Sequence, residues 1–506
     1  MQGHSEPNRE LLDAAALCRK LVPEGSVEAF LADHRHELFP DVLFADLFPS
    51  GRGRPSVPAD VMATVMVLQA LEGLSDRDAA RALRDRISWK VACGLALDDE
   101  GFHHTVLTYW RNRLRASERP ERIFEAVRQV VEATGVLKGK TRRAVDSTLL
   151  DDAVATQDTV TQLISAIRRV RREVPAATEV VLHAYHYDQG GKPIIAWDDP
   201  AAKQHLVSAL VNDALALMEA TEHAELSPEQ QDAIGLLALV AGQDVEPGDE
   251  EGTWRIAEKV ASDRVISTVD PQARHMHKSQ STYRDGYKAH LAVEPGTGLV
   301  TACSLTPANA GDGPTGVAML EVEEPGLEVL ADSAYGSGEV RAALAEAKHQ
   351  AFIKPIPLRS AVPSGFTIDD FAIDTAAGTV TCPQGSTVRI TRRGNAVFGQ
   401  RCTGCPLRER CTQSKRGRRI RVHSHHDVML AARRQAETEE FKTLYRRHRP
   451  MAERSIAWLV AGGHRRVRYR GVVRNQMWLS VRSAAINLRR LVNLGLDHSG
   501  GWILAT

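Results

Sequence analysis

The chain has 506 residues, 43% hydrophobic and 25% charged, so it is long enough for two or three globular domains with sizeable cores. Lysine plus arginine and aspartate plus glutamate number 64 each, so composition alone does not indicate a nucleic-acid binder. The polar N-terminus and the lack of any apolar run of spanning length argue against a secreted or membrane protein, and we expect a cytoplasmic one.

Residues 1–135 are predicted to form a helical domain. Within it, residues 59–72 carry apolar side chains at helical spacing, and Ser75 is placed to cap a second helix after a short glycine turn. Two helices joined in this way outline a helix-turn-helix pair. Arg77 and Arg81 on the second helix would then contact phosphates. The alternative is the solvated face of an ordinary helical pair.

Two apolar segments are each followed directly by an aspartate. Residues 142–145 lead to Asp146, and residues 327–331 lead to Asp332. Both runs are typical of strands, and open α/β sheets place their sites at strand ends. An aspartate after a strand is also a common turn former or helix cap, so the pattern alone leaves both roles open.

A third acid, Glu453, lies in a charged and then apolar segment that is predicted to be helical. Tyr445, Arg449 and Glu453 recur every four residues and would share one helical face. Pro450 lies between the last two and cannot donate to the carbonyl one turn before it. The segment should therefore kink, or a new helix should begin, at this proline.

Together these segments resemble the catalytic motifs of bacterial insertion-sequence transposases of the DDE type. The spacing from Arg449 to Glu453 matches the family. Tyr445 lies one residue further from Arg449 than the family's tyrosine does, and Val460 stands where the family has lysine. The resemblance covers most of the chain in the family's order. It includes Gly53-Arg54-Pro55, Gly73-Leu74-Ser75-Asp76-Arg77, Asp270-Pro271, Tyr287-Lys288-Ala289-His290, Arg468-Tyr469-Arg470-Gly471 and Asn487-Leu488-Arg489-Arg490-Leu491.

The resemblance implies a mixed α/β fold, in which a ribonuclease-H-like sheet is flanked by helices. Alternation and turn residues predict a hairpin over residues 287–305, and this hairpin would join the Asp146 strand as the first three strands. The Asp332 strand and residues 351–356 would be the fourth and fifth. The expected division is a helical N-terminal domain for DNA binding or dimerisation (1–135), the first catalytic strand (136–152), a mostly helical insertion (153–261), further catalytic strands (262–360), a Cys-containing and Arg-rich β insertion (361–425), and a catalytic helix with a basic tail (426–506).

The resemblance also implies an activity. Two Mg²⁺ or Mn²⁺ ions held by Asp146, Asp332 and Glu453 would support phosphodiester cleavage at the element's ends and transfer of the 3′ end to target DNA. Arg449 would stabilise charge on the transferring phosphate, and Tyr445 would pack against an end nucleotide. The partners would be double-stranded DNA, both transposon ends and target, and a second copy of the chain, on the nucleoid. No P-loop is present, so no nucleotide cofactor is implied.

Two other function classes remain open from the sequence. A nuclease of the same fold without strand transfer shares the first chemical step. A DNA-binding relative without catalysis would also keep the basic segments, although intact acids at all three positions argue against it.

Four of the seven cysteines cluster between residues 382 and 411. The spacing of Cys402 and Cys405 lets two thiolates meet one tetrahedral zinc ion, and Cys382 and Cys411 could complete the ligand set. A disulfide is the alternative, disfavoured where thiols stay reduced. A structural zinc would hold together a small β insertion that lacks a core of its own.

Arginine is densest around these cysteines and again after Glu453. Its planar guanidinium can donate two hydrogen bonds to one phosphate, and two basic runs flanking an acidic site suggest a polyanionic substrate. The predicted DNA contacts are Arg77, Arg81, Arg416, Arg418, Arg419, Arg466, Arg468 and Arg470.

Overall fold

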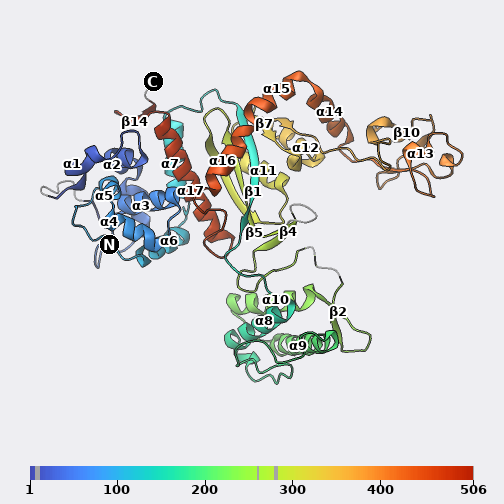
Figure 1. The fold of residues 1–506 in the computed structure, drawn as a ribbon, viewed down its shortest axis with the longest axis horizontal. Helices are drawn as coiled ribbons and strands as arrows, with labels where there is room; N and C mark the ends of the chain where they lie inside the picture. Colours follow the sequence, from blue (N-terminus) through green and yellow to red (C-terminus); the bar gives the residue numbers. More distant parts are fainter. Residues whose placement is uncertain (6–11, 259–260, 262, 278–282, 505–506) are drawn as a thin grey trace.

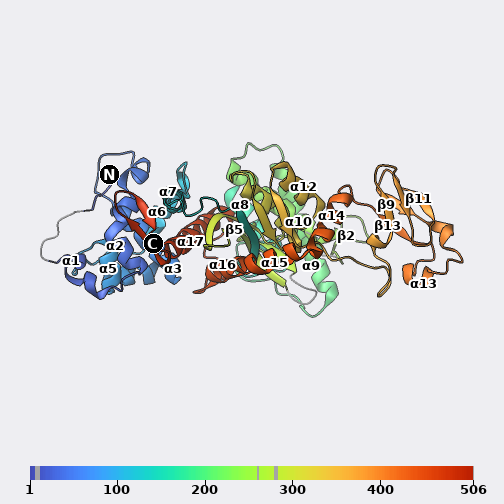
Figure 2. The ribbon, with the colours of Figure 1, turned by 90° about the horizontal axis from the view of Figure 1, so that it is seen from above.

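The computed structural model describes residues 1–5, 12–258, 261, 263–277 and 283–504. The protein is elongated, with a helical N-terminal region at one end, a mixed sheet in the middle, and a small β-rich arm at the other end (Figures 1 and 2). A helical insertion projects from the middle. The expected mixed α/β class is confirmed. Among the described residues, no helix is both long and apolar enough to cross a membrane.

The N-terminal region is helical, as predicted. The two helices of the predicted pair differ in burial. α3 is buried along nearly its whole length, whereas α4 buries only one stripe of side chains. The hydroxyl of Ser75 accepts the backbone N–H of Asp78 and caps α4 as expected. The helices are α1 (Ala14–Cys18), α2 (Val27–Leu38), α3 (Ala59–Glu72), α4 (Asp76–Asp85), α5 (Ile87–Cys93), α6 (Thr105–Ala116) and α7 (Arg122–Ala133).

The central sheet contains the five predicted strands and one more. By pairing, β6, β5 and β1 are antiparallel neighbours, and β7 and β8 continue from β1 in parallel, while β4 pairs with the start of β5. The strands are β1 (Arg142–Asp151), β4 (Arg274–His277), β5 (Tyr283–Glu294), β6 (Leu299–Pro307), β7 (Glu328–Ala331) and β8 (Gln350–Ile353).

The fifth predicted strand is shorter than expected. β8 ends at Ile353 and not at residue 356, because Pro355 has no N–H to donate to the neighbouring strand. One further bond, from the N–H of Lys354 to the carbonyl of Ala331, closes the ladder. The sequence also gave no indication of β4.

Helices cover both faces of the sheet. On one face, α11 (Asp312–Leu320) and α12 (Gly338–Glu346) pack on side chains such as Val145 and Val329. On the other face, α16 (Pro450–Val460) and α17 (Val472–Asn493) pack on Leu291, Leu330 and their neighbours. This second core continues without a break into the N-terminal helices, because α17 contacts α3, α7 and β6.

The insertion after β1 has a core of its own. It consists of α8 (Thr159–Glu173), α9 (Pro200–Thr221), α10 (Pro228–Gln243) and the small ribbon β2 (Val245–Pro247) and β3 (Trp254–Ile256). It lies away from the N-terminal helices and beyond the edge of the sheet that carries β4 (Figure 1).

The β-rich arm is built from short strands around a few apolar side chains. Phe371, Val380 and Phe398 belong to this small core. Two helices then return the chain to the sheet, ahead of α16. The elements are β9 (Ala372–Asp374), β10 (Thr379–Thr381), β11 (Thr387–Arg389), β12 (Asn395–Val397), α13 (Arg408–Cys411), β13 (Arg419–Arg421), α14 (His426–Glu437) and α15 (Glu439–His448), with β14 (Leu496–His498) and β15 (Trp502–Leu504) at the end of the chain.

Candidate functional site

Asp146 lies in the middle of β1, the strand that joins the antiparallel and parallel halves of the sheet, and not at a strand end as predicted, because residues 147–151 continue the antiparallel pairing with β5. Opposite Leu291 on β5, it faces the side covered by α16. Its carboxylate is 14% exposed. Burial raises the pKa of this carboxyl group, whereas the neighbouring Arg449 opposes the rise. A carboxylate that is held on a central strand and only partly hydrated is suited to bind a cation or a proton.

Asp332 follows the last residue of β7, the strand next to β1. One of its carboxylate oxygens accepts the N–H of Ala334 at 2.9 Å and caps the 3₁₀ helix Ser333–Tyr335. β1 and β7 are parallel neighbours with Ala144 opposite Leu330, so Asp146 and Asp332 both lie two residues further along adjacent strands. Asp332 is therefore a turn cap and a member of an acidic pair at the same time.

Arg449 supplies the positive charge of this site. It lies between α15 and α16, and its Nη2 atom is 3.0 Å from Oδ2 of Asp146. The side chain is 8% exposed, and its Nε and Nη1 atoms have no hydrogen-bond partner among the described residues. Burial would lower the pKa of Arg449, but the carboxylate of Asp146 keeps it above its ordinary value. The guanidinium is thus a fixed cation with unused donors.

Tyr445 lies one helical turn before Arg449, on α15. Its ring stacks on Phe441 with centroids 5.5 Å apart, and burial raises the pKa of its hydroxyl group. Tyr445 also lines a cavity of about 730 Å³ together with Lys354, Lys442 and Arg446. The sequence gave no indication of this cavity, because its lining comes from the segment after β8 and from two helices.

Pro450 begins a new helix, which is one of the two outcomes predicted for it. The proline occupies the first turn of α16, where its missing N–H is not needed. Glu453 lies in the same first turn, and its side chain is exposed. No described hydrogen bond or ion pair joins Glu453 to the two aspartates. The structure therefore brings together Asp146, Asp332, Arg449 and Tyr445, with Glu453 one helical turn beyond Arg449.

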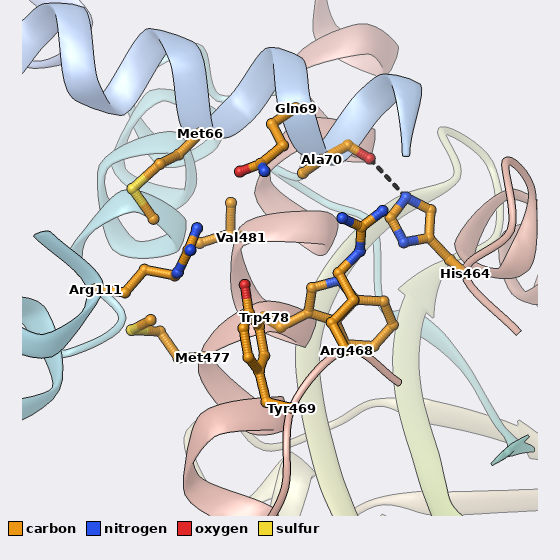
Figure 3. A pocket seen from close by; sticks show the side chains of 10 residues that line it. All are labelled: Met66, Gln69, Ala70, Arg111, His464, Arg468, Tyr469, Met477, Trp478 and Val481. Atoms are coloured by element: carbon orange, nitrogen blue, oxygen red, sulfur yellow. Dashed lines mark hydrogen bonds between the residues drawn. The ribbon is translucent and has the colours of Figure 1, made fainter. Parts of the chain in front are cut away.

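The N-terminal helices are fastened to the segment that follows α16 (Figure 3). Nε2 of the buried His464 donates to the carbonyl of Ala70 in α3 at 3.0 Å, and Arg468 donates to the carbonyls of Gly73 and Leu74. Gly73 has a positive φ of 74°, and a Cβ there would lie 2.1 Å from the carbonyl oxygen of Gly462. The turn between α3 and α4 therefore packs tightly on the segment that follows α16.

Arg482 of α17 also joins the N-terminal helices to the C-terminal part of the chain. Its buried guanidinium donates to the carbonyls of Ala70 and Leu71 in α3, and to those of Trp458, Leu459 and Ala461 at the end of α16. One cation thus satisfies the C-terminal carbonyls of two helices, where the helix dipoles are negative. Burial lowers the pKa of Arg482 to about 10, which leaves it charged at neutral pH.

The predicted DNA contacts divide into exposed and internal arginines. Arg418 is buried and donates to the carbonyls of Cys411 and Phe366, and Arg468 is occupied by the α3–α4 turn. Arg418 is buried and Arg468 is half-buried, and both guanidinium groups bond to backbone carbonyls of the protein itself. The exposed members are Arg77, Arg81, Arg416, Arg419, Arg466 and Arg470.

The four clustered cysteines all line one small cavity in the arm. They are free thiols, and the sulfur of Cys402 accepts the N–H of Arg418 at 3.4 Å. Burial raises the pKa of Cys411. Within the described ranges, no group of three or more His, Cys, Asp or Glu side chains is spaced to hold a metal ion. This applies to the cysteines and to the three carboxylates alike.

Two family models match the chain. One, described as a transposase DDE domain, matches residues 381–492, which include Arg449 and Glu453. The other, described as a transposase domain (DUF772), matches residues 18–113, which include α3 and α4. No curated protein and no solved structure matches.

Proposed function

The chain belongs to the transposases with a DDE domain and an N-terminal transposase domain, and on this premise we propose that it cuts the ends of a mobile DNA element and joins their 3′ ends to target DNA. The observation that carries the proposal is the pairing of Asp146 and Asp332 beside Arg449. A transposase must act on a phosphodiester, and this site combines oxygen ligands for a cation with a guanidinium for a phosphate.

Transposases with a DDE domain generally use a divalent metal. The residues that would hold Mg²⁺ or Mn²⁺ here are Asp146, Asp332 and Glu453. The two aspartates fit, because they offer hard oxygen donors on neighbouring strands. Glu453 would have to turn inward from its exposed position on α16 to join them. Two bound ions would supply activation of the attacking oxygen and stabilisation of the leaving oxygen.

The protein's own residues would prepare the phosphate. Arg449 would neutralise charge on the transferring phosphoryl group through Nε and Nη1, which have no other partner in the described part of the chain. Tyr445 would pack against the terminal nucleotide at the rim of its cavity. Lys442 and Arg446, which line the same cavity, would contact the adjoining phosphates.

The DNA-binding surfaces would lie at the two ends of the molecule. Arg77 and Arg81 project from α4, the exposed helix of the predicted pair. At the opposite end, the arm carries eleven lysines and arginines against four acids between residues 361 and 425. Arg416 and Arg419 are exposed there and form no ion pair among the described residues. Arg466 and Arg470 add exposed charge beside the sheet. We expect double-stranded DNA to contact all three regions.

The arm would be held together by a structural zinc ion. Four thiols around one cavity are the donor set that zinc prefers, and the N–H of Arg418 already points at one sulfur, as backbone donors do toward metal-bound thiolates. Binding would require the thiolates to move inward to a common tetrahedral spacing. Because both element ends must be handled together, a homodimer at the nucleoid is the proposed working form.

The proposal is tested by cleavage of a labelled element end by the full-length protein. Replacement of Asp146, Asp332 or Glu453 by Ala should abolish cleavage and leave DNA affinity nearly unchanged, since affinity depends on phosphate contacts elsewhere. Retained cleavage in Asp332→Ala would overturn the assignment. Joining of a pre-cut 3′ end to a second duplex distinguishes a transposase from a nuclease of the same fold, because a nuclease would not join it.

A further inference from the structure

The face of β1 opposite to the site carries a second set of charged side chains. Ser147 points to this face, where its hydroxyl donates to Oδ1 of Asp312 at 2.9 Å. Asp312 is the first residue of α11. The ammonium of Lys288 on β5 lies 3.0 Å from the same oxygen and also donates to the carbonyl of Ala310 at 2.7 Å. These contacts fasten the start of α11 to β1 and β5 directly behind Asp146.

The pair is almost fully enclosed. The side chains of Lys288 and Asp312 are 4% and 14% exposed, and His290 beside them is completely buried. Burial lowers the pKa of His290 to about 4, so the imidazole is neutral at pH 7. Lys288 and Asp312 therefore balance each other's charge. The cluster adds rigidity behind Asp146 without adding net negative charge to it.

The same helix reaches the turn that holds Asp332. Tyr335, the last residue of the 3₁₀ helix capped by Asp332, is buried against α11. A Cβ at Gly316 would lie 2.7 Å from the Tyr335 ring, so the absence of a side chain lets the ring pack there. α11 thus contacts the backbone segments of both aspartates, at Ser147 through Asp312 and at Tyr335 through Gly316.

We propose that the Lys288–Asp312 pair is a positioning device, which fixes α11 behind β1 and thereby sets the separation of the Asp146 and Asp332 carboxylates for a divalent cation. The inference rests on the proposed function. Two carboxylates repel each other, and an aspartate side chain is too short to correct a backbone displacement. Groups behind the ligands that hold their geometry typically change metal affinity by about 10- to 100-fold when removed.

The test compares Asp312→Asn with a matched control near the other end of α11. Arg143 on β1 and Glu323 just after α11 form another enclosed ion pair, at 2.6 Å, and Glu323 has the same 14% exposure as Asp312. Each substitution, Asp312→Asn or Glu323→Gln, removes one buried charge, so both should lower the melting temperature. Only Asp312→Asn should weaken Mn²⁺ binding, by about 10-fold or more, with DNA affinity unchanged.

Mn²⁺ binding is measured on the DNA-free, full-length protein by loss of the electron paramagnetic resonance signal of free Mn²⁺. Ser147→Ala is the second variant, because it breaks the link to β1 without leaving a charge unpaired. Equal Mn²⁺ affinity in wild type, Asp312→Asn and Ser147→Ala would overturn the inference while the proposed function stands. If wild-type binding does not depend on Asp146, the proposed metal site and the inference fall together.

Discussion

Nη2 of Arg449 lies 3.0 Å from Oδ2 of Asp146, so in the absence of DNA the carboxylate has a protein cation as its counter-ion. The pair joins β1 to the junction of α15 and α16, two parts of the chain separated by about 300 residues. When DNA and a metal ion bind, Asp146 would bind the metal ion and the guanidinium of Arg449 would turn to the phosphate. Arg449 would therefore act both in the resting site, as the counter-ion of Asp146, and in the proposed reaction.

Replacement of Arg449 by Met should lower the rate of end cleavage about 100-fold, because one fixed donor to the developing charge is lost. Affinity for the element end should stay within about twofold, since most phosphate contacts lie elsewhere. Single-turnover cleavage and a binding titration measure the two quantities. Arg447→Met is the control, because Arg447 is exposed on the same helix. Equal rates in the two variants would remove Arg449 from the site.

Removal of Arg77 and Arg81 together should weaken binding to element ends and reduce the dependence of affinity on salt. Each phosphate contact contributes about one unit to the slope of log affinity against log salt, so the slope should become shallower by about two. The control is the double variant Arg169→Ala and Arg172→Ala, on α8, where both side chains pair with Glu173. If the slope changes equally in both variants, the prediction that DNA contacts α4 is wrong.

Purified protein should carry about one Zn²⁺ per chain that survives EDTA washing, as thiolate ligands hold zinc in a closed site. The double variant Cys402→Ser and Cys405→Ser should lose this metal and lower the melting temperature before cleavage is affected. Cys18→Ser, which changes a thiol far from the arm, serves as control. Metal analysis that finds no zinc in freshly reduced protein would leave the arm supported by its strands and by its small apolar core, which includes the Phe371–Phe398 contact.

Acid should destabilise the protein through its buried histidines. Burial lowers the pKa of His464 to about 3, whereas an unfolded histidine titrates near pH 6.5. The unfolded state therefore binds the proton first, and stability falls as pH decreases below about 6.5, by at most about 1.4 kcal/mol per pH unit for this group. His290 acts in the same direction.

Asp152 opposes this effect, because burial raises its pKa to about 6, so its contribution to stability decreases as pH rises through that value. The prediction is therefore a difference between proteins. The melting temperature of His464→Gln should fall less than that of wild type between about pH 7 and about pH 5. Identical pH profiles would show that His464 binds its proton equally well in the folded and the unfolded protein, and would contradict the prediction.

The strands that carry the aspartates were predictable because each begins with a short apolar run, but only β7 ends at its aspartate, whereas β1 continues past Asp146 to Asp151. The hairpin from β5 to β6 was equally plain from its alternation and its glycine-rich turn. These are local signals, and local signals also predicted the Ser75 cap and the new helix at Pro450. Periodicity and turn chemistry were therefore sufficient for most of the central sheet.

The contacts that position the site were not predictable from local patterns. Lys288 meets Asp312 only because the register of β5 on β1 sets it opposite the start of α11. Arg418 and Arg468 lie in the basic runs and were expected on DNA, yet both bond to carbonyl groups inside the protein. The basic residues around an arginine do not reveal whether it binds a phosphate or caps backbone carbonyls, because the guanidinium uses the same N–H donors for both.

The bonds of Arg482 to the ends of α3 and α16 hold these two helices together, and under the proposed function they would set a fixed spacing along the bound DNA. If α4 binds the element's terminal repeat, the bond to be cut must lie at a set number of base pairs from that repeat. The reason is that α3, which leads into α4, and α16 are held together by Arg482. Duplexes with a few extra base pairs between repeat and cut should be bound as tightly but cut poorly or at a displaced bond. Efficient cutting at the original bond in such duplexes would show that the junction flexes.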